Sequence, residues 1–194
     1  MVRTLVFDYP TALEHATRAF WRAGYAGTSL RDLLSAMGIG EGSFYNTMKS
    51  KKRAYLESLK HYNATVTRAR EEAFAAAPTA ALGMRAFFRV MLESLDDPET
   101  PRVCLMAGSL SPDVLADAEL GGYVRDQYAD WTRQLIERFA ADRRSGLLPE
   151  SFVPERIAPV IVTFIQGFWR TALLPHERGS LERQVDAFLT ALGL

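Results

Sequence analysis

The side chains that most often carry covalent or metal chemistry are few and scattered in this sequence. The single cysteine, Cys104, and the histidines His15, His61 and His176 lack the spacing of metal ligands. A glycine-rich phosphate loop, an HExxH motif and a nucleophile elbow are absent, and we find no convincing catalytic carboxylate pair on one helix face. We therefore expect no metal and no cofactor, and the residues give little support to the alternative of a small helical enzyme acting on an apolar substrate.

Side chains that bind through hydrogen bonds gather instead in a short helix expected over residues 41–48. Phe44 marks its buried side, and the residues on its other faces are Glu41, Gly42, Ser43, Tyr45, Asn46 and Thr47. A preceding short helix has Thr28 or Ser29 as its N-cap and ends in a turn at residues 38–40. Its apolar face carries Leu30, Leu33, Leu34 and Met37. Two short helices joined by a glycine turn match the helix-turn-helix that enters the DNA major groove, although spacing alone leaves an ordinary helical hairpin open.

Helical periodicity extends through every segment long enough to judge, which predicts an all-α fold of about nine helices. A first helix opens near Pro10 and ends at Gly24, and Ser50 caps a fourth. After Pro78 the helices become longer and more hydrophobic. The longest apolar stretch, residues 158–165, is well short of the ~20 residues that cross a bilayer. The start of the chain lacks a secretory pattern, so we expect a cytoplasmic protein without a membrane partner.

Charge is divided unevenly along the chain, although the net charge is zero. Residues 1–60 hold 9 basic and 5 acidic side chains, a net charge of +4. The remainder holds 14 basic and 18 acidic side chains, a net charge of −4. Attraction to a polyanion would therefore be local to the first part of the chain and sensitive to salt.

The segment from Ala16 to Leu56 resembles the DNA-binding signature of the TetR family of transcriptional regulators. The matching features are Phe20, Gly24-Tyr25, Thr28-Ser29-Leu30, Met37-Gly38-Ile39, Gly42-Ser43-Phe44-Tyr45 and Ser50-Lys51. The resemblance implies a helix-turn-helix DNA-binding domain over residues 1–50 and a linking fourth helix over residues 51–76. It implies a ligand-binding and dimerisation domain over residues 77–194.

Roles in DNA binding follow from this resemblance. Thr28 and Ser29 would offer hydroxyls and amides to a phosphate at a helix N-terminus, and Tyr45 and Lys51 would contact the backbone. The candidates for reading bases are Ser43, Asn46 and Thr47, because an Asn amide pairs with adenine and hydroxyls reach several base edges. Gly40 and Gly42 would let the backbone approach the duplex.

Two features depart from the family pattern. Glu41 stands where many members have Lys, Arg or Pro, and a carboxylate there is unfavourable near phosphate unless it accepts from a cytosine amino group. Asn46-Thr47-Met48 replaces a more aromatic end of the recognition helix. The base preference of other members therefore cannot be transferred to this chain.

The resemblance also implies an effector site and a dimer interface in the second domain. The candidate pocket residues are Phe87, Phe88, Met91, Met106, Tyr128, Trp131 and Phe168, which would suit a small hydrophobic or aromatic effector. Taken one at a time, each of these residues is better explained by core packing than by a ligand contact. The last two helices would form the homodimer interface, with Phe164, Leu181, Val185, Phe188 and Leu192 as candidates.

Cys104 has two interpretations. A free cysteine is usually a small buried hydrophobe, and the alternative is a redox sensor activated by Arg102 and a nearby helix start. The function predicted for the whole chain is a repressor that binds a palindromic operator as a dimer and is released by a ligand. A helical ligand carrier or adaptor that does not bind DNA is the alternative.

Overall fold

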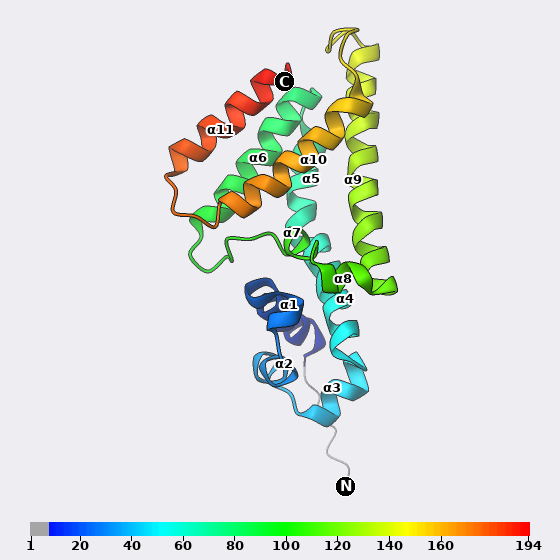
Figure 1. The fold of residues 1–194 in the computed structure, drawn as a ribbon, viewed down its shortest axis with the longest axis vertical. Coiled ribbons are helices and arrows are strands. Elements are labelled where there is room, and N and C mark those ends of the chain that lie inside the picture. The colour runs from blue at the N-terminus through cyan, green and yellow to red at the C-terminus, as the bar shows by residue number, and fades with distance from the viewer. Residues whose placement is uncertain (1–7) are drawn as a thin grey trace. The chain divides into compact units, whose positions relative to one another are not determined.

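The computed structural model describes residues 8–194, and helices make up the regular structure of this part of the chain (Figure 1). They are α1 Tyr9–Gly27, α2 Leu30–Met37, α3 Glu41–Met48, α4 Lys51–Tyr62, the π-helical turn η1 Asn63–Thr67, α5 Arg68–Ala76, α6 Ala80–Asp96, α7 Leu105–Gly108, α8 Pro112–Ala116, α9 Ala118–Arg144, α10 Pro154–Thr171 and α11 Arg178–Ala191. The predicted all-α fold is confirmed, and none of these helices is long and apolar enough to cross a membrane.

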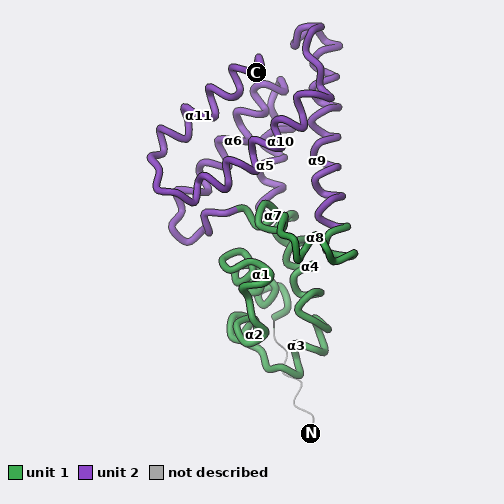
Figure 2. Tube along the Cα trace, viewed as in Figure 1, with its two compact units in different colours: residues 1–65, 104–122 green, residues 66–103, 123–194 purple. Residues whose placement is uncertain are grey.

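The described chain forms two compact units (Figure 2). Unit 1 contains the residues up to Thr65 together with Cys104–Gly122, and unit 2 contains Val66–Val103 and Tyr123–Leu194. The units therefore do not follow the order of the sequence, because α7, α8 and the first residues of α9 group with the N-terminal helices. The assignment of DNA binding and ligand binding to separate domains stays a prediction.

Two expected helices are interrupted. Gly24 has a φ of +73°, which ends the regular part of α1 where the sequence predicts, although helical turns resume as far as Gly27. The single helix expected over residues 51–76 is divided by η1. Within η1 the Thr65 hydroxyl donates to the His61 carbonyl at 2.8 Å, a side-chain bond that competes with the regular helical ladder. The boundary between the two units falls inside this π-helical turn.

Aromatic side chains form the core of unit 1, where α1 packs against α2 and α4. Phe20 is fully buried and meets the Tyr55 ring edge-on at 4.9 Å. Trp21 and Tyr62 make a second such pair at 4.8 Å. Burial raises the pKa of the Tyr55 hydroxyl above its usual range. These pairs fix α1 against α4, so the two short helices α2 and α3 are attached to a rigid base.

In unit 2, α6 packs against α5 and α11. The start of α6 is fixed by Asp142, whose buried carboxylate accepts the Ala80 N–H at 2.6 Å. Gly83 allows α5 and α6 to approach closely, because a Cβ at this position would lie 2.6 Å from the Phe74 carbonyl oxygen. Burial of Met84, Phe88 and Met91 between the helices supplies the apolar contacts of this core.

Candidate functional site

The first helix of the candidate DNA-binding motif, α2, is fixed at both ends by its own sequence. Ser29 is its N-cap, and the Ser29 hydroxyl accepts the Asp32 N–H at 3.2 Å. The Asp32 carboxylate accepts the Ser29 N–H at 2.9 Å and the Ser29 hydroxyl at 2.6 Å, and these bonds hold the pKa of Asp32 below its ordinary value. Gly38 closes the helix in the left-handed conformation, with a φ of +65°.

The second helix, α3, has one face inside unit 1 and one face outside. Phe44 and Met48 are buried, one helical turn apart. The Tyr45 ring is 46% exposed, and Glu41 and Asn46 are also exposed. Ser43 and Thr47 are half-buried beside them. The structure thus brings the predicted base-reading and backbone-contacting residues of α3 onto its outer side.

Gly40, the N-cap of α3, and Gly42, within it, are both exposed, and packing does not require glycine at either position. A Cβ added at either position would meet nothing within 4 Å. Gly42 lies inside α3, where glycine costs about 0.5–1 kcal/mol of stability relative to alanine. The missing side chain therefore has no explanation in the contacts of the described residues.

The prediction for the Thr28 hydroxyl is corrected by the structure. Thr28 is 1% exposed, and its hydroxyl donates to the Gly24 carbonyl at 2.7 Å. It therefore supports the turn between α1 and α2 from the inside and leaves no surface for a phosphate. The neighbouring Ser29 is exposed, as the N-cap prediction requires, although its N–H and hydroxyl are already bonded to Asp32.

The turn after α3 holds a residue that the sequence analysis missed. Lys49 has a φ of +64°, and the Ser50 N–H reaches across it to the Met48 carbonyl at 2.7 Å, which makes a γ-turn. Strained backbone of this kind is found most often at functional positions. The Lys49 ammonium donates to the Asn46 carbonyl at 2.7 Å, so a cation stands at the end of α3.

A row of three cations opens α4, and each has a different environment in unit 1. The Lys51 ammonium lies over the Tyr25 ring, 4.6 Å from its centre. The Lys52 ammonium lies 3.3 Å from an Asp117 carboxylate oxygen and 3.4 Å from Glu119, and Asp117 is the main cause of its raised pKa. Arg53 pairs with Glu57 at 2.9 Å. Of the three, Lys51 is therefore the cation best suited to an external anion.

The candidate effector residues of unit 2 form an aromatic cluster. Phe87 stacks on Trp131 with ring centres 5.3 Å apart, and Phe88 meets Phe168 at 6.4 Å. Phe87, Phe88, Phe168 and Met91 are buried, whereas Tyr128 and Trp131 are half-buried. Met106 lies in α7, which belongs to unit 1, and its place in the pocket stays a prediction.

Four further residues extend this cluster and were missed by the sequence analysis: Arg70, Phe74, Gln166 and Trp169. Arg70 is 3% exposed and its guanidinium lies 4.9 Å from the centre of the Trp169 ring. The Tyr128 hydroxyl donates to the Gln166 side-chain oxygen at 2.9 Å. The spacing of Arg70 and Phe74, one helical turn apart, was the available signal for a buried face on α5.

The candidate dimer residues are partly used inside the protomer. Leu181 and Val185 are 2% and 6% exposed, so these two interface predictions are corrected: their side chains are covered within the chain. The Phe164 ring stacks on Phe188 at 3.7 Å, and both are half-buried, as is Leu192. Helical periodicity predicts that a face is buried but does not tell whether the same chain or a second copy covers it.

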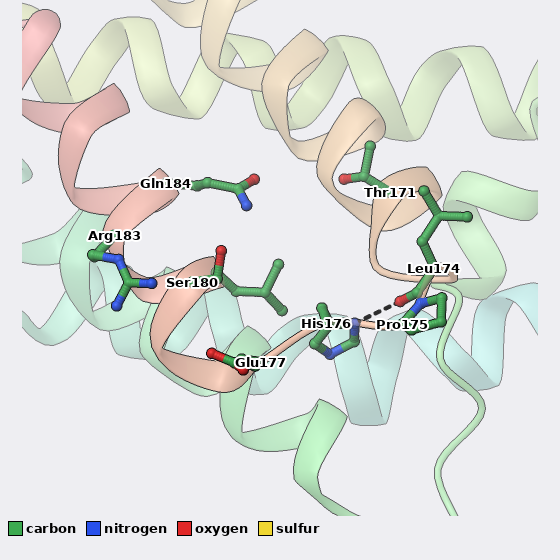
Figure 3. Close-up of a pocket in the computed structure, with 9 residues that line it drawn as sticks. Thr171, Leu174, Pro175, His176, Glu177, Ser180, Arg183 and Gln184 are labelled. Atoms are coloured by element: carbon green, nitrogen blue, oxygen red, sulfur yellow. Dashed lines mark hydrogen bonds between the residues drawn. The ribbon is translucent and has the colours of Figure 1, made fainter.

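A surface pocket of about 650 Å³ lies where α10 leads into α11 (Figure 3). A hydrogen bond of 2.9 Å joins His176 Nδ1 and the Leu174 carbonyl at its edge. Most of its lining residues are polar in type, and they are Thr171, Leu174, Pro175, His176, Glu177, Ser180, Leu181, Arg183 and Gln184. These residues differ in kind from the aromatic cluster expected to hold an effector.

Cys104 is buried in unit 1, and its thiol accepts a hydrogen bond from the Tyr62 hydroxyl at 3.4 Å. Its 7% exposure fits the interpretation as a small buried hydrophobe. Among the described residues, no group of three or more His, Cys, Asp or Glu side chains is arranged to hold a metal ion.

Comparison with known proteins places these features in context. The family model described as bacterial regulatory proteins, tetR family, matches residues 12–53. An uncharacterised HTH-type transcriptional regulator of Bacillus subtilis (strain 168), YezE, is 32% identical over 139 residues, which cover 72% of this chain and 70% of that protein. The HTH-type transcriptional repressor ComR of Escherichia coli (strain K12) is 24% identical over 196 residues, covering 99% of this chain and 90% of ComR.

Solved structures give the same result. The TetR family transcriptional regulator CifR, as a cysteine mutant in complex with 26-bp double-stranded operator DNA, is 29% identical. The match has a TM-score of 0.87 and covers 97% of this chain and 99% of the CifR chain. A TetR transcriptional regulator from Chloroflexus aurantiacus shares the fold, with a TM-score of 0.83 at 19% identity over 94% of this chain and 92% of that chain.

Proposed function

The chain belongs to the tetR family of bacterial regulatory proteins, and from this we propose that it acts as a homodimeric repressor released from a palindromic operator by a small effector. It is a DNA-binding transcriptional regulator, as its relatives are, and not an enzyme. Its place of action would be the cytoplasm, where the operator is.

The observation that carries the proposal is the outer side of α3. Tyr45 and Asn46 are exposed there, Ser43 and Thr47 stand beside them, and Gly42 leaves the helix bare. Tyr45 and Lys51 would contact the DNA backbone, while Ser43, Asn46 and Thr47 would read base edges. In a dimer, the two copies of α3 would enter successive major grooves about 34–36 Å apart or a multiple of that distance.

Release by an effector needs a connection between the two units. Helix α9 begins in unit 1 and continues in unit 2, where it carries Tyr128 and Trp131. At its start, Asp117 and Glu119 hold Lys52 in the first turn of α4. An effector that shifts α9 would therefore also move α4 and change the position of the DNA-reading helices.

For dimerisation, we propose the outer face of α10 together with the edges of Phe164, Phe188 and Leu192. Val160 is 46% exposed on this face, and a Cβ at Gly167 would meet nothing within 4 Å. A bare apolar helix face suits close contact with the same face of a second copy. Sedimentation velocity should give the mass of two chains.

The test is a fluorescence anisotropy titration of a palindromic duplex taken from the DNA upstream of the gene. The double substitution Tyr45→Ala, Lys51→Ala should weaken binding at least tenfold, about 1.4 kcal/mol or more, because it removes two backbone contacts in each subunit. Lys60→Ala, an exposed lysine farther along α4, is the matched control and should bind like the wild type. Full binding by the double variant would refute these contacts, and failure of the wild type to bind any duplex would favour the ligand carrier.

A further inference from the structure

Arg70 places a permanent positive charge inside unit 2. Its side chain is 3% exposed, whereas Arg68, two residues earlier on the same helix, is exposed. An arginine does not lose its proton on burial, so the guanidinium stays charged inside the unit. A charge in such an environment interacts more strongly with an anion than it would in water.

Arg70 belongs to a closed circuit of six side chains on α5, α9 and α10. The guanidinium of Arg70 covers Trp169 at 4.9 Å, and Gln166 lies one turn before Trp169 on α10. The side-chain oxygen of Gln166 accepts from Tyr128 at 2.9 Å, and Trp131 follows Tyr128 by one turn on α9.

The circuit closes through the third helix. Trp131 meets Phe74 edge-on at 5.4 Å, and Phe74 lies one turn after Arg70 on α5. Each step is therefore a direct contact or one helical turn, and all six residues belong to unit 2. Tyr128, Trp131 and Gln166 are half-buried, so one side of the circuit retains accessible surface.

We propose that this circuit binds an organic anion, and that the effector is an aromatic molecule with a carboxylate. The Arg70 guanidinium would bind the carboxylate through two parallel hydrogen bonds. The rings of Trp131, Trp169 and Phe74 would cover the aromatic body, and the Tyr128–Gln166 pair would fix its orientation. This inference rests on the proposed function, because it names the chemical class of the effector that unit 2 is proposed to bind.

The experiment uses the full-length protein without DNA and follows tryptophan fluorescence, since Trp131 and Trp169 both belong to the circuit. The probes are aromatic carboxylates, phenylacetate, 3-phenylpropionate and indole-3-acetate, each compared with its uncharged primary amide. At least one acid should bind about tenfold more tightly than its amide, because only the acid makes the charge-assisted pair.

Variants assign that difference to Arg70. Arg70→Gln should remove the preference for acid over amide. Arg70→Lys should retain part of it, because lysine keeps the positive charge but cannot make two parallel hydrogen bonds to a carboxylate. Arg68→Gln, which changes an exposed arginine on the same helix, should behave like the wild type. If Arg70→Gln fails to fold, as judged by circular dichroism, the comparison of Arg70→Lys with the wild type decides.

Two results would overturn the inference: every amide binding as tightly as its acid, or no acid in the panel binding at all. Neither would affect the proposed function, since operator binding is measured separately. Conversely, acids that bind through Arg70 but leave operator affinity unchanged would uphold the anion site and refute release by this ligand.

Discussion

Two helical positions of this protein hold glycine in opposite surroundings. Gly83, in α6 of unit 2, has its space filled by the chain itself, since a Cβ would lie 2.6 Å from the Phe74 carbonyl oxygen. Gly42, in α3 of unit 1, has open space around it. Packing inside the protein explains the glycine at position 83, and we propose that the approach of DNA explains the glycine at position 42. Unit 1 thus carries its proposed function on an outer face, whereas unit 2 carries it inside.

The largest effect on stability should come from adding a Cβ at Gly83, where the space is already occupied. Gly83→Ala should lower the free energy of unfolding by about 1–3 kcal/mol, because backbone must move to admit the Cβ. Gly122→Ala, in α9, is the control, because a Cβ there meets nothing within 4 Å, and it should cause no loss. Urea denaturation measures both, and equal stability of the two variants would contradict the contrast.

Adding a Cβ at Gly42, where the space is open, should instead raise stability. Gly42→Ala should raise the free energy of unfolding by about 0.5–1 kcal/mol, because alanine is the better helix former. The same methyl should weaken operator binding about threefold to tenfold by obstructing the duplex, a cost comparable to about 1 kcal/mol. Gly108→Ala, on another open helical position of unit 1, should leave operator affinity unchanged. A Gly42→Ala variant with full affinity would show that the bare surface serves no DNA contact.

A smaller effect is expected at the start of α2, where the outer face of unit 1 is held in place. Ser29→Ala removes the N-cap and should cost about 1 kcal/mol at neutral pH. The greater stability of the wild type also depends on pH, because hydrogen bonds to Ser29 lower the pKa of Asp32 from 3.8. A lowered carboxyl pKa stabilises the fold above 3.8, and this contribution is lost as the pH falls through the lowered value. Urea denaturation at neutral and acid pH should show that the difference in free energy of unfolding between wild type and variant becomes smaller in acid. A difference that does not change with pH would contradict this.

The outer face could be predicted from sequence because local rules determine it. Caps, glycine turns and the apolar positions Leu33, Met37 and Phe44 place α2 and α3 within a residue of their observed bounds. Thr28 was misplaced because two adjacent hydroxyl residues both suit an N-cap, and only the structure shows that Ser29 takes this role.

The interior of unit 2 was less predictable because it depends on contacts between distant segments. Arg70 is charged, and a charged residue in a polar helix is expected at the surface unless Trp169 is known to cover it. Leu181 and Val185 form a genuine apolar stripe, but a sequence cannot tell a core stripe from a dimer stripe.

The salt dependence of binding to the palindromic duplex tests the central claim most directly. If the outer face of unit 1 binds phosphates, the logarithm of the binding constant should fall linearly with the logarithm of salt concentration, by about 0.9 for each phosphate contact. Lys51→Gln should make this slope shallower by about one contact in each subunit. A binding constant that does not change with salt, or a Lys51→Gln variant with the wild-type slope, would contradict the account.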